Sequence, residues 1–268
     1  MRLHIYQGLD NEKVPKDVTH VIVDNSVAII KAKAFMNCTQ LVSVIMSDQV
    51  KIIEMFAFFG CCVLRFIRLS NTLAYIGNLG FWGCESLEAL FLPSTVRSIE
   101  YEAFVHCRSL RLLILPNCMD LSNAGFRIIG GTAIEKVARA AGVEYEWKRG
   151  ALTDESNRRV NEWLIHHMDK TPFHKLCYTS FITTKQINNY LNEDISNSAL
   201  QSDPVRSMTP LHLLAMNPHA PADSIVALFE SNIDAVFSLD NDLNTPLDYA
   251  REYNAGGLLA MIASLSIH

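Results

Sequence analysis

A histidine and a cysteine are adjacent in the stretch YEAFVHCRSL, which covers residues 101–110. A histidine can act as the base that converts a neighbouring thiol into a thiolate nucleophile. Carboxylate pairs such as Glu100 with Glu102, or Asp240 with Asp242, could in turn serve as a general acid and a general base. These residues are the first candidates for a catalytic site.

A second group of residues has side chains that zinc prefers. Four candidate ligands fall within twelve positions: His166, His167, His174 and Cys177. Their spacing does not match a tetrahedral site, since two adjacent histidines on one helix point to different faces. We expect no metal here, and we expect His174 to make structural hydrogen bonds.

Sequence motifs of the common enzyme classes are missing. The chain contains no G-x-S-x-G, no H-E-x-x-H, no kinase signature and no dinucleotide fingerprint. The sequence therefore predicts a protein that is not an enzyme and uses no cofactor. An enzyme whose catalytic residues are dispersed along the chain remains an alternative.

Composition indicates a folded protein. The chain has 268 residues, of which 49% are hydrophobic and 19% are charged. No apolar run approaches the roughly 18 residues of a membrane-spanning helix, and the first residues lack the apolar core of a secretory signal. We therefore expect a cytoplasmic protein without a membrane partner, whose seven cysteines are reduced thiols.

Charge is unevenly spread between the two halves. Residues 1–150 hold 16 Lys and Arg against 14 Asp and Glu, whereas residues 151–268 hold 7 against 14. Neither half contains a dense Lys/Arg cluster, which is the footprint of phosphate neutralisation. The sequence therefore predicts no nucleic-acid partner.

An internal repeat explains the cysteine of the opening stretch. Cysteine and phenylalanine each recur every 23 residues, and apolar residues recur with them. A single unit cannot bury its own apolar face, so the units are expected to stack like residue over like residue. The predicted core comprises Phe35, Cys38, Phe58, Cys61, Phe81, Cys84, Phe104 and Cys107. Cys107 is therefore predicted to be a buried structural thiol, and His106 a surface turn residue.

The repeated pattern L-x-x-I-x-L-P-x-x-V-x-x-I-x-x-x-A-F-x-x-C-x-x-L resembles the BspA-type leucine-rich repeat over about residues 18–117. This resemblance implies a curved β-solenoid with short helical turns, which binds other proteins and has no catalysis of its own. We count four full units and a truncated fifth. Beyond them, Thr132 and Glu135 form a capping box for a helix that ends at Gly142 and is expected to close the stack.

The second half has a different period. The stretches TPFHKLC, TPLHLLA and TPLDYA begin at residues 171, 209 and 245 and resemble the ankyrin repeat, which implies an array of paired helices. The glycine that usually stands two residues before Thr-Pro is replaced by Asp169, Ser207 and Leu243. We therefore predict two domains: a capped solenoid at 1–150 and a degenerate ankyrin-like helical domain at 151–268, packed on the capped end of the solenoid.

Strand positions that should face outward are unexpectedly apolar. Side chains alternate between the two faces of a strand, so these positions are predicted to form a partner-binding face. Its residues are Ile45, Arg65, Phe66, Arg68, Phe91, Leu112 and Ile114. The sequence thus predicts a non-catalytic interaction scaffold for an unidentified protein partner. Three alternatives remain open: homo-association through this face as a structural protein, a surface adhesin, and an enzyme.

Overall fold

The computed structural model describes the 268 residues except for 120–126, 145–146, 149–150, 194–197, 205 and 266–268. The chain divides into two compact units, Met1–His167 (the first unit) and Met168–His268 (the second unit). The division falls after His167, later than the boundary at residue 150 that the sequence predicts. The physical reason is that Val160, Leu164 and Ile165 are buried in the hydrophobic core of the first unit.

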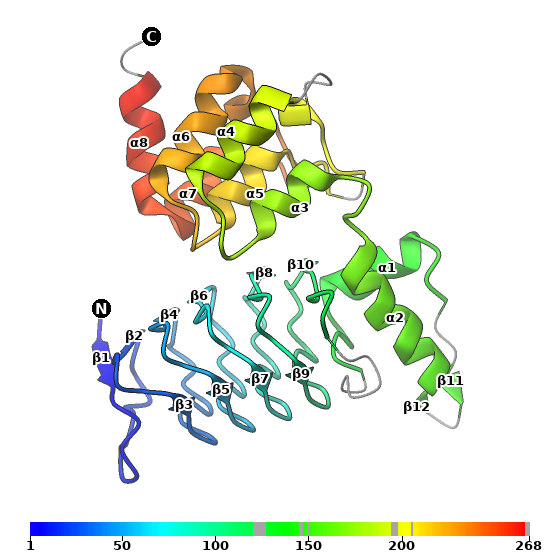
Figure 1. Cartoon of the computed structure of the whole chain (residues 1–268). Helices are drawn as coiled ribbons and strands as arrows, with labels where there is room; N and C mark the ends of the chain where they lie inside the picture. Colours follow the sequence, from blue (N-terminus) through cyan, green and yellow to red (C-terminus); the bar gives the residue numbers. More distant parts are fainter. Residues whose placement is uncertain (120–126, 145–146, 149–150, 194–197, 205, 266–268) are drawn as a thin grey trace. The chain divides into compact units, whose positions relative to one another are not determined.

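The first unit is a β-solenoid whose turns lie side by side (Figure 1). One parallel sheet has the strand order β1-β2-β4-β6, a second has the order β3-β5-β7-β9, and β8 pairs with β10. The strands are β1 (Leu3–Tyr6), β2 (His20–Val23), β3 (Ile29–Ile30), β4 (Ser43–Ile45), β5 (Ile52–Ile53), β6 (Phe66–Arg68), β7 (Tyr75–Ile76), β8 (Ala89–Leu90), β9 (Ser98–Ile99) and β10 (Leu112–Leu113). From β2 onward their register is the 23-residue period itself, as in the pairing of Val21 with Val44 and of Val44 with Ile67.

A column of aromatic rings runs through the core. The ring centroids of Phe35 and Phe58 lie 5.0 Å apart, as do those of Phe58 and Phe81, and both pairs are stacked with planes 8° apart. Phe104 continues the column at 5.8 Å, and Tyr6 closes it at 5.0 Å from Phe35. All four phenylalanines are fully buried, which confirms the predicted stacking of like over like.

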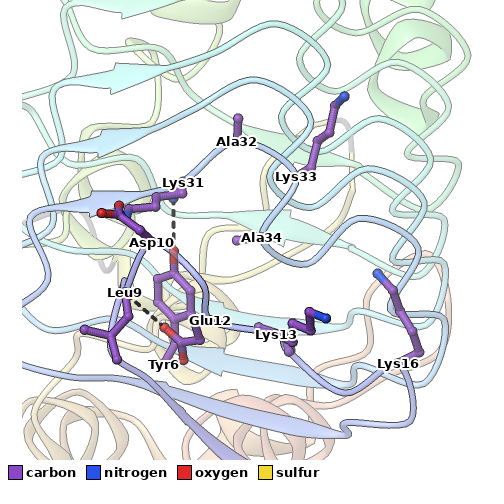
Figure 2. Close-up of a pocket in the computed structure, with 11 residues that line it drawn as sticks. Tyr6, Leu9, Asp10, Glu12, Lys13, Lys16, Lys31, Ala32, Lys33 and Ala34 are labelled. Atoms are coloured by element: carbon purple, nitrogen blue, oxygen red, sulfur yellow. Dashed lines mark hydrogen bonds and ion pairs between the residues drawn. The ribbon is translucent and has the colours of Figure 1, made fainter.

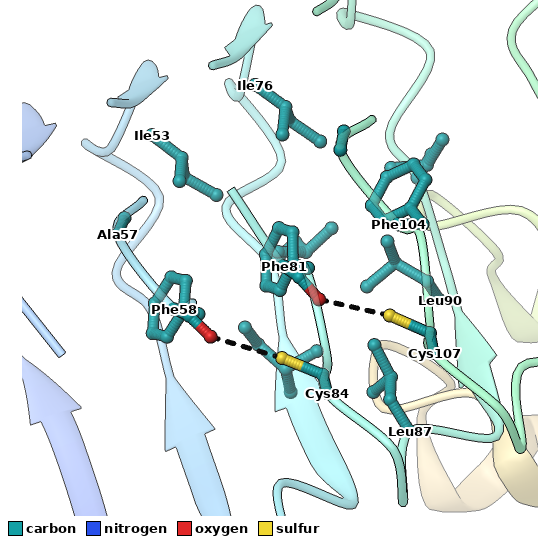
Figure 3. Close-up of a cluster of buried hydrophobic side chains, with 14 of the residues drawn as sticks. Ile53, Ala57, Phe58, Ile76, Phe81, Cys84, Leu87, Leu90, Phe104 and Cys107 are labelled. Atoms are coloured by element: carbon teal, nitrogen blue, oxygen red, sulfur yellow. Dashed lines mark hydrogen bonds between the residues drawn. The ribbon is translucent and has the colours of Figure 1, made fainter. Parts of the chain in front are cut away.

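The repeated cysteines form a second column beside the rings (Figure 3). The Cys84 thiol donates to the Phe58 carbonyl at 3.3 Å, and the Cys107 thiol donates to the Phe81 carbonyl at 3.0 Å. Cys61 makes the same contact with Phe35 at 3.1 Å. Each thiol therefore satisfies a carbonyl of the preceding turn, and it does so inside the core.

The four residues that precede these cysteines share an uncommon backbone conformation. Asn37, Gly60, Gly83 and His106 have φ values of 56°, 70°, 71° and 61°. Their N–H groups donate to carbonyls of the following turn, for example from Asn37 to Phe59 at 2.7 Å. His106 donates in the same way to Gly130 at 2.9 Å, and it therefore is the turn residue that the repeat predicts.

Helix α1 (Ala133–Ala140) follows the last turn of the solenoid. Thr132 Oγ1 accepts from the Glu135 N–H at 3.3 Å, which confirms Thr132 as the N-cap. The Glu135 carboxylate accepts from the Gly131 N–H at 2.7 Å rather than from Thr132, so the reciprocal half of the predicted capping box is shifted by one residue. The Ile134 N–H donates to the Leu110 carbonyl at 2.8 Å. The helix therefore lies against the fifth turn.

Helix α2 (Asp154–His166) completes the first unit, after a short antiparallel pair of β11 (Trp147–Lys148) and β12 (Ala151–Leu152). Its Leu164 carbonyl accepts from the Leu115 N–H at 3.1 Å. The far end of the stack is thus closed by two helices rather than by one.

The second unit is helical in the residues that the structure describes. Its elements are α3 (Pro172–Tyr178), α4 (Thr184–Glu193), η1 (Ser198–Leu200), α5 (Pro210–Met216), α6 (Ala222–Ser231), η2 (Ile233–Phe237), α7 (Pro246–Tyr253) and α8 (Ala255–Leu265). Helix α5 packs between α3 and α7, and helix α6 packs between α4 and α8 (Figure 1). The three proline-initiated helices thus form one row and the other helices a second.

Buried polar side chains connect the repeats of the second unit. The Nε2–H group of His174 donates to the Met208 carbonyl at 2.8 Å, and that of His212 donates to the Asn244 carbonyl at 3.2 Å. The Asn217 amide donates to the carbonyls of Cys177 and Thr179 at 3.0 and 2.9 Å. His174 therefore makes the structural hydrogen bond that we expected.

The loops before the Thr-Pro steps keep a left-handed residue without glycine. Ser207 and Leu243 have φ values of 57° and 63°. This conformation is costly for a side chain with a Cβ atom. At Leu243 this conformation persists because hydrogen bonds hold the residues on both sides of it. The Asp240 carboxylate accepts from the N–H groups of Asp242 and Asn244, both at 2.9 Å.

Candidate interaction surface

A row of exposed apolar residues lies on one face of the sheet β1-β2-β4-β6, here called the outer sheet face. Ile5, Ile22 and Ile45 are 54%, 41% and 40% exposed, and they pair in register across three adjacent strands. Leu3 is 51% exposed on the same face. The pleat therefore places a continuous apolar row on the protein surface.

Arginines lie at one end of this row. Arg68 pairs in register with Ile45, and its guanidinium lies 3.8 Å from the Asp48 carboxylate. The Arg65 guanidinium is exposed and lies 3.6 Å from Glu88. Such exposed ion pairs contribute little stability, so their main effect is to surround an apolar patch with charge. Phe66, between the two arginines, is half-buried.

Three residues of the predicted binding face are not on the surface. Phe91, Leu112 and Ile114 are 3%, 0% and 5% exposed, which corrects the expectation that the face continues over the fourth and fifth turns. The exposed part of the face therefore lies on β1, β2, β4 and β6.

Two residues at the other end of the face were missed by the sequence analysis. The predicted binding face does not include Leu3 and Ile5, yet β1 pairs in full register with β2. The alternation in RLHIY contains the signal, since aligning Ile5 with Ile22 assigns β1 to the same face. The accessible part of the outer sheet face therefore covers the first three turns.

A cavity of about 400 Å³ opens beside the first turn (Figure 2). Lys13, Lys16, Lys31 and Lys33 line it together with Asp10, Glu12 and the buried Tyr6, among others. No local motif indicates this group, because its lysines come as two pairs on opposite sides of β2 in the sequence.

The two carboxylates in this cavity are already engaged. Asp10 forms an ion pair with Lys31, which holds the pKa of that carboxyl below its usual range. Glu12 accepts from the N–H groups of Gln7 and Leu9 at 3.0 and 3.2 Å. The remaining lysines give the cavity a positive character that suits an anionic group, but no nucleophile and base are paired in it.

The residues of the opening stretch do not form a catalytic pair. The Cys107 side chain is fully buried and donates to the core carbonyl of Phe81, whereas the His106 ring packs edge-on against Trp82 at 5.1 Å. The Glu102 carboxylate lies 3.4 Å from the Arg127 guanidinium, and Glu100 accepts from the Ser98 hydroxyl at 3.0 Å. Each group therefore has a structural partner.

Other thiols are buried as well. Burial raises the pKa values of the Cys61, Cys84 and Cys177 thiols, so these groups stay protonated near neutral pH. All seven cysteines are free. Across the described parts of the chain, no three His, Cys, Asp or Glu side chains gather in a way that could hold a metal ion. Likewise, no helix in those parts has the length and apolarity to cross a membrane.

Comparison with known proteins identifies the repeat of the first unit. Residues 15–129 match the BspA type leucine rich repeat region in six copies, which is less than half of the chain. The match counts six copies where we counted four full units and a truncated fifth, and it extends beyond residue 117, where we expected the repeat to end. No curated protein matches the chain.

Two solved leucine-rich repeat proteins are similar to part of the chain. The T. pallidum leucine rich repeat protein is 28% identical over 43% of this chain and 55% of its own, with a TM-score of 0.41. A leucine-rich repeat protein from Bacteroides ovatus is 22% identical over 50% of this chain and 35% of its own, with a TM-score of 0.37. This chain thus covers about half and about a third of their lengths.

Proposed function

We propose that the protein is a non-catalytic interaction scaffold that binds a partner protein through the outer sheet face of its solenoid. The observation that carries the proposal is the in-register row of Ile5, Ile22 and Ile45, which is exposed along three strands and bordered by Arg65 and Arg68. Contiguous apolar surface with arginine at its rim is typical of interaction sites.

The energetics favour a function for this row over a purely structural role. Apolar surface removed from water contributes about 25 cal/mol per Å², and three branched side chains in line offer that gain to any complementary surface. A sheet tolerates such residues on its surface, but a charged or small residue would fit equally well there, as Ser43 does in the neighbouring row. The expected partner surface is apolar at its centre and acidic or polar at its edge.

The second unit is proposed to be an ankyrin-like array and a second interaction module. Three observations support this: helices that begin at Thr-Pro, hydrogen bonds from His174 and His212 to the following loops, and left-handed residues before two of the Thr-Pro steps. Its loops expose Phe237 and Leu243, at 65% and 75%. A partner could therefore contact the array through these loops.

The scaffold is proposed to act in the cytoplasm and without catalysis. Its seven free thiols are compatible with a reducing compartment. Leucine-rich repeat proteins are generally non-catalytic, and each candidate acid, base or nucleophile described above has a structural partner. A surface adhesin or a self-assembling structural protein is the alternative use of the same apolar face.

Affinity capture tests the proposal. The double variant Ile22→Glu, Ile45→Glu places two charges on the outer sheet face, at positions where solvent already reaches the side chain. The matched control is Ile29→Glu, since Ile29 is similarly exposed but belongs to the sheet of β3. All three proteins are first shown to have the same thermal unfolding curve.

Quantitative mass spectrometry then compares the proteins that each bait captures from the source cell. The proposal predicts a partner that is lost with the double variant and retained with Ile29→Glu. Identical capture by all three baits would contradict it and assign the face a structural role.

A further inference from the structure

We infer that the first strand, β1, forms a two-fold symmetric dimer with β1 of a second copy of this chain. The inference rests on the backbone groups at the edge of the sheet, whereas the proposed partner binds the face. Strand β1 pairs with β2 on one side only and is the terminal strand of the four-stranded sheet. Figure 1 shows β1 at the end of the stack of turns.

The hydrogen bonds define which groups of β1 are open. The carbonyls of Arg2 and Tyr6 accept from His20 and Asp24 of the second turn, at 3.1 and 2.9 Å. Because N–H and C=O of one residue point to the same side of a strand, and successive residues alternate, those of Leu3 and Ile5 point away from β2. Further along, the Gln7 N–H is occupied by the Glu12 carboxylate.

This pattern is complementary to itself. In an antiparallel pair centred on His4, Leu3 of one copy lies opposite Ile5 of the other, and both pairs fall at hydrogen-bonded positions. About four new hydrogen bonds then satisfy every open group of Leu3 and Ile5 in both copies. The exposed side chains of Leu3 and Ile5 meet their counterparts on the outer sheet face, so burial adds to the pairing.

The edge also lacks the features that normally prevent such pairing. Natural edge strands carry lysine, proline or a bulge, and the sequence LHIY of β1 has none of them. Arg2, just before the strand, forms an ion pair with Asp17. A charged side chain therefore does not stand unpaired at the open edge.

Head-to-tail stacking of solenoids is opposed by the helices at the far end. There the Leu110 carbonyl already accepts from Ile134, and the Leu115 N–H already donates to Leu164. The edge of β1 can instead pair with the identical edge of a second copy, which gives a closed two-fold contact. The contact is short, so we expect a reversible dimer whose population rises with concentration.

Sedimentation velocity of the full chain over a wide concentration range tests the inference. The variant Ile5→Pro removes an N–H that makes no hydrogen bond within one chain. Proline is tolerated at such a position of an edge strand. We expect it to weaken dimerisation by about tenfold or more, because two intermolecular hydrogen bonds and the extended geometry are lost. Ile5→Lys, which adds a natural edge guard without changing the backbone, should have the same effect.

Three further variants test which surface forms the contact and in which register the strands pair. Ile45→Glu changes the face two strands away and should dimerise like the wild type. In a background of Cys62→Ser and Cys118→Ser, His4→Cys should form an intermolecular disulfide under mild oxidation, since residue 4 lies opposite itself, and Leu3→Cys should not. A wild type that stays monomeric would overturn the inference, as would a dimer that survives Ile5→Lys and is lost with Ile45→Glu.

Discussion

In the first unit, neighbouring turns meet through identical apolar side chains, whereas in the second unit neighbouring repeats meet through buried polar side chains that bond to backbone carbonyls. The Phe58 and Phe81 rings stack 5.0 Å apart, and the Cys84 thiol satisfies a carbonyl beside them. In the second unit, His174 and Asn217 reach carbonyls that lie 34 and 40 residues away. Strict stacking requires an invariant period, but a polar side chain can bridge repeats of unequal length.

This difference explains why one period is strict and the other is not. An insertion in the solenoid would move a phenylalanine out of its column and leave a cavity. In the helical unit the Thr-Pro steps are 38 and 36 residues apart, so the period is not constant. The two units should therefore respond differently to apolar truncation, to polar truncation and to acid.

The largest effect is expected from the aromatic column. Phe81→Ala should lower the free energy of unfolding by about 3–5 kcal/mol, because it removes a fully buried ring between two others. Urea denaturation followed by circular dichroism measures the change. Phe237→Ala is the control, since that ring is largely exposed, and its cost should be close to zero. Equal costs for the two variants would contradict the assignment of Phe81 to the core.

Loss of a buried polar bridge should come next. Asn217→Ala removes hydrogen bonds to the carbonyls of Cys177 and Thr179 and leaves both without this donor. The expected cost is about 1–3 kcal/mol, measured by thermal unfolding and proteolysis of the second unit. Gln201→Ala, at an exposed position, is the control. A neutral Asn217→Ala would show that the bridge does not stabilise the repeats.

Acid should weaken the second unit before the first. Burial lowers the pKa of His174 below its ordinary value of 6.5, so the unfolded chain takes up a proton that the folded chain does not. This contribution to stability is fully present above about pH 6.5 and is lost as the pH falls below that value, at no more than about 1.4 kcal/mol per pH unit. Unfolding of His174→Gln and wild type between pH 7.5 and 5 measures it. The variant should show a flatter dependence, and equal slopes would contradict the assignment.

Only those features of the two units that follow from local sequence patterns were predictable. The burial of column residues such as Phe58 and Cys84 follows from the 23-residue period at which they recur. The N-cap at Thr132 follows from a pattern of only four residues, Thr132 to Glu135. Burial of Phe91 and Leu112 was not predictable, because the alternation of a strand does not tell whether its outer face is covered. The sequence of helix α2 likewise did not indicate that Leu164 packs in the core of the first unit.

The smallest expected effect is a gain in stability. Thr72 and Thr95 each donate a hydroxyl to a carbonyl of the preceding turn, at 2.9 and 2.7 Å, and Cys118 occupies the next position of this ladder. Cys118→Thr should raise the free energy of unfolding by about 0.5–1 kcal/mol, because a hydroxyl is a stronger donor than a thiol. Differential scanning calorimetry would detect the shift, and a lower melting temperature would exclude Cys118 from the ladder.

The most direct test of the scaffold is a footprint of the protein bound to its captured partner. Hydroxyl-radical labelling with mass spectrometry reads the solvent access of side chains in both units at once. The account predicts protection of Ile22, Ile45 and Phe66 on the outer sheet face when the partner is bound. Unchanged labelling of these residues in the complex, with protection confined to Phe237 and Leu243, would contradict it and transfer binding to the helical unit.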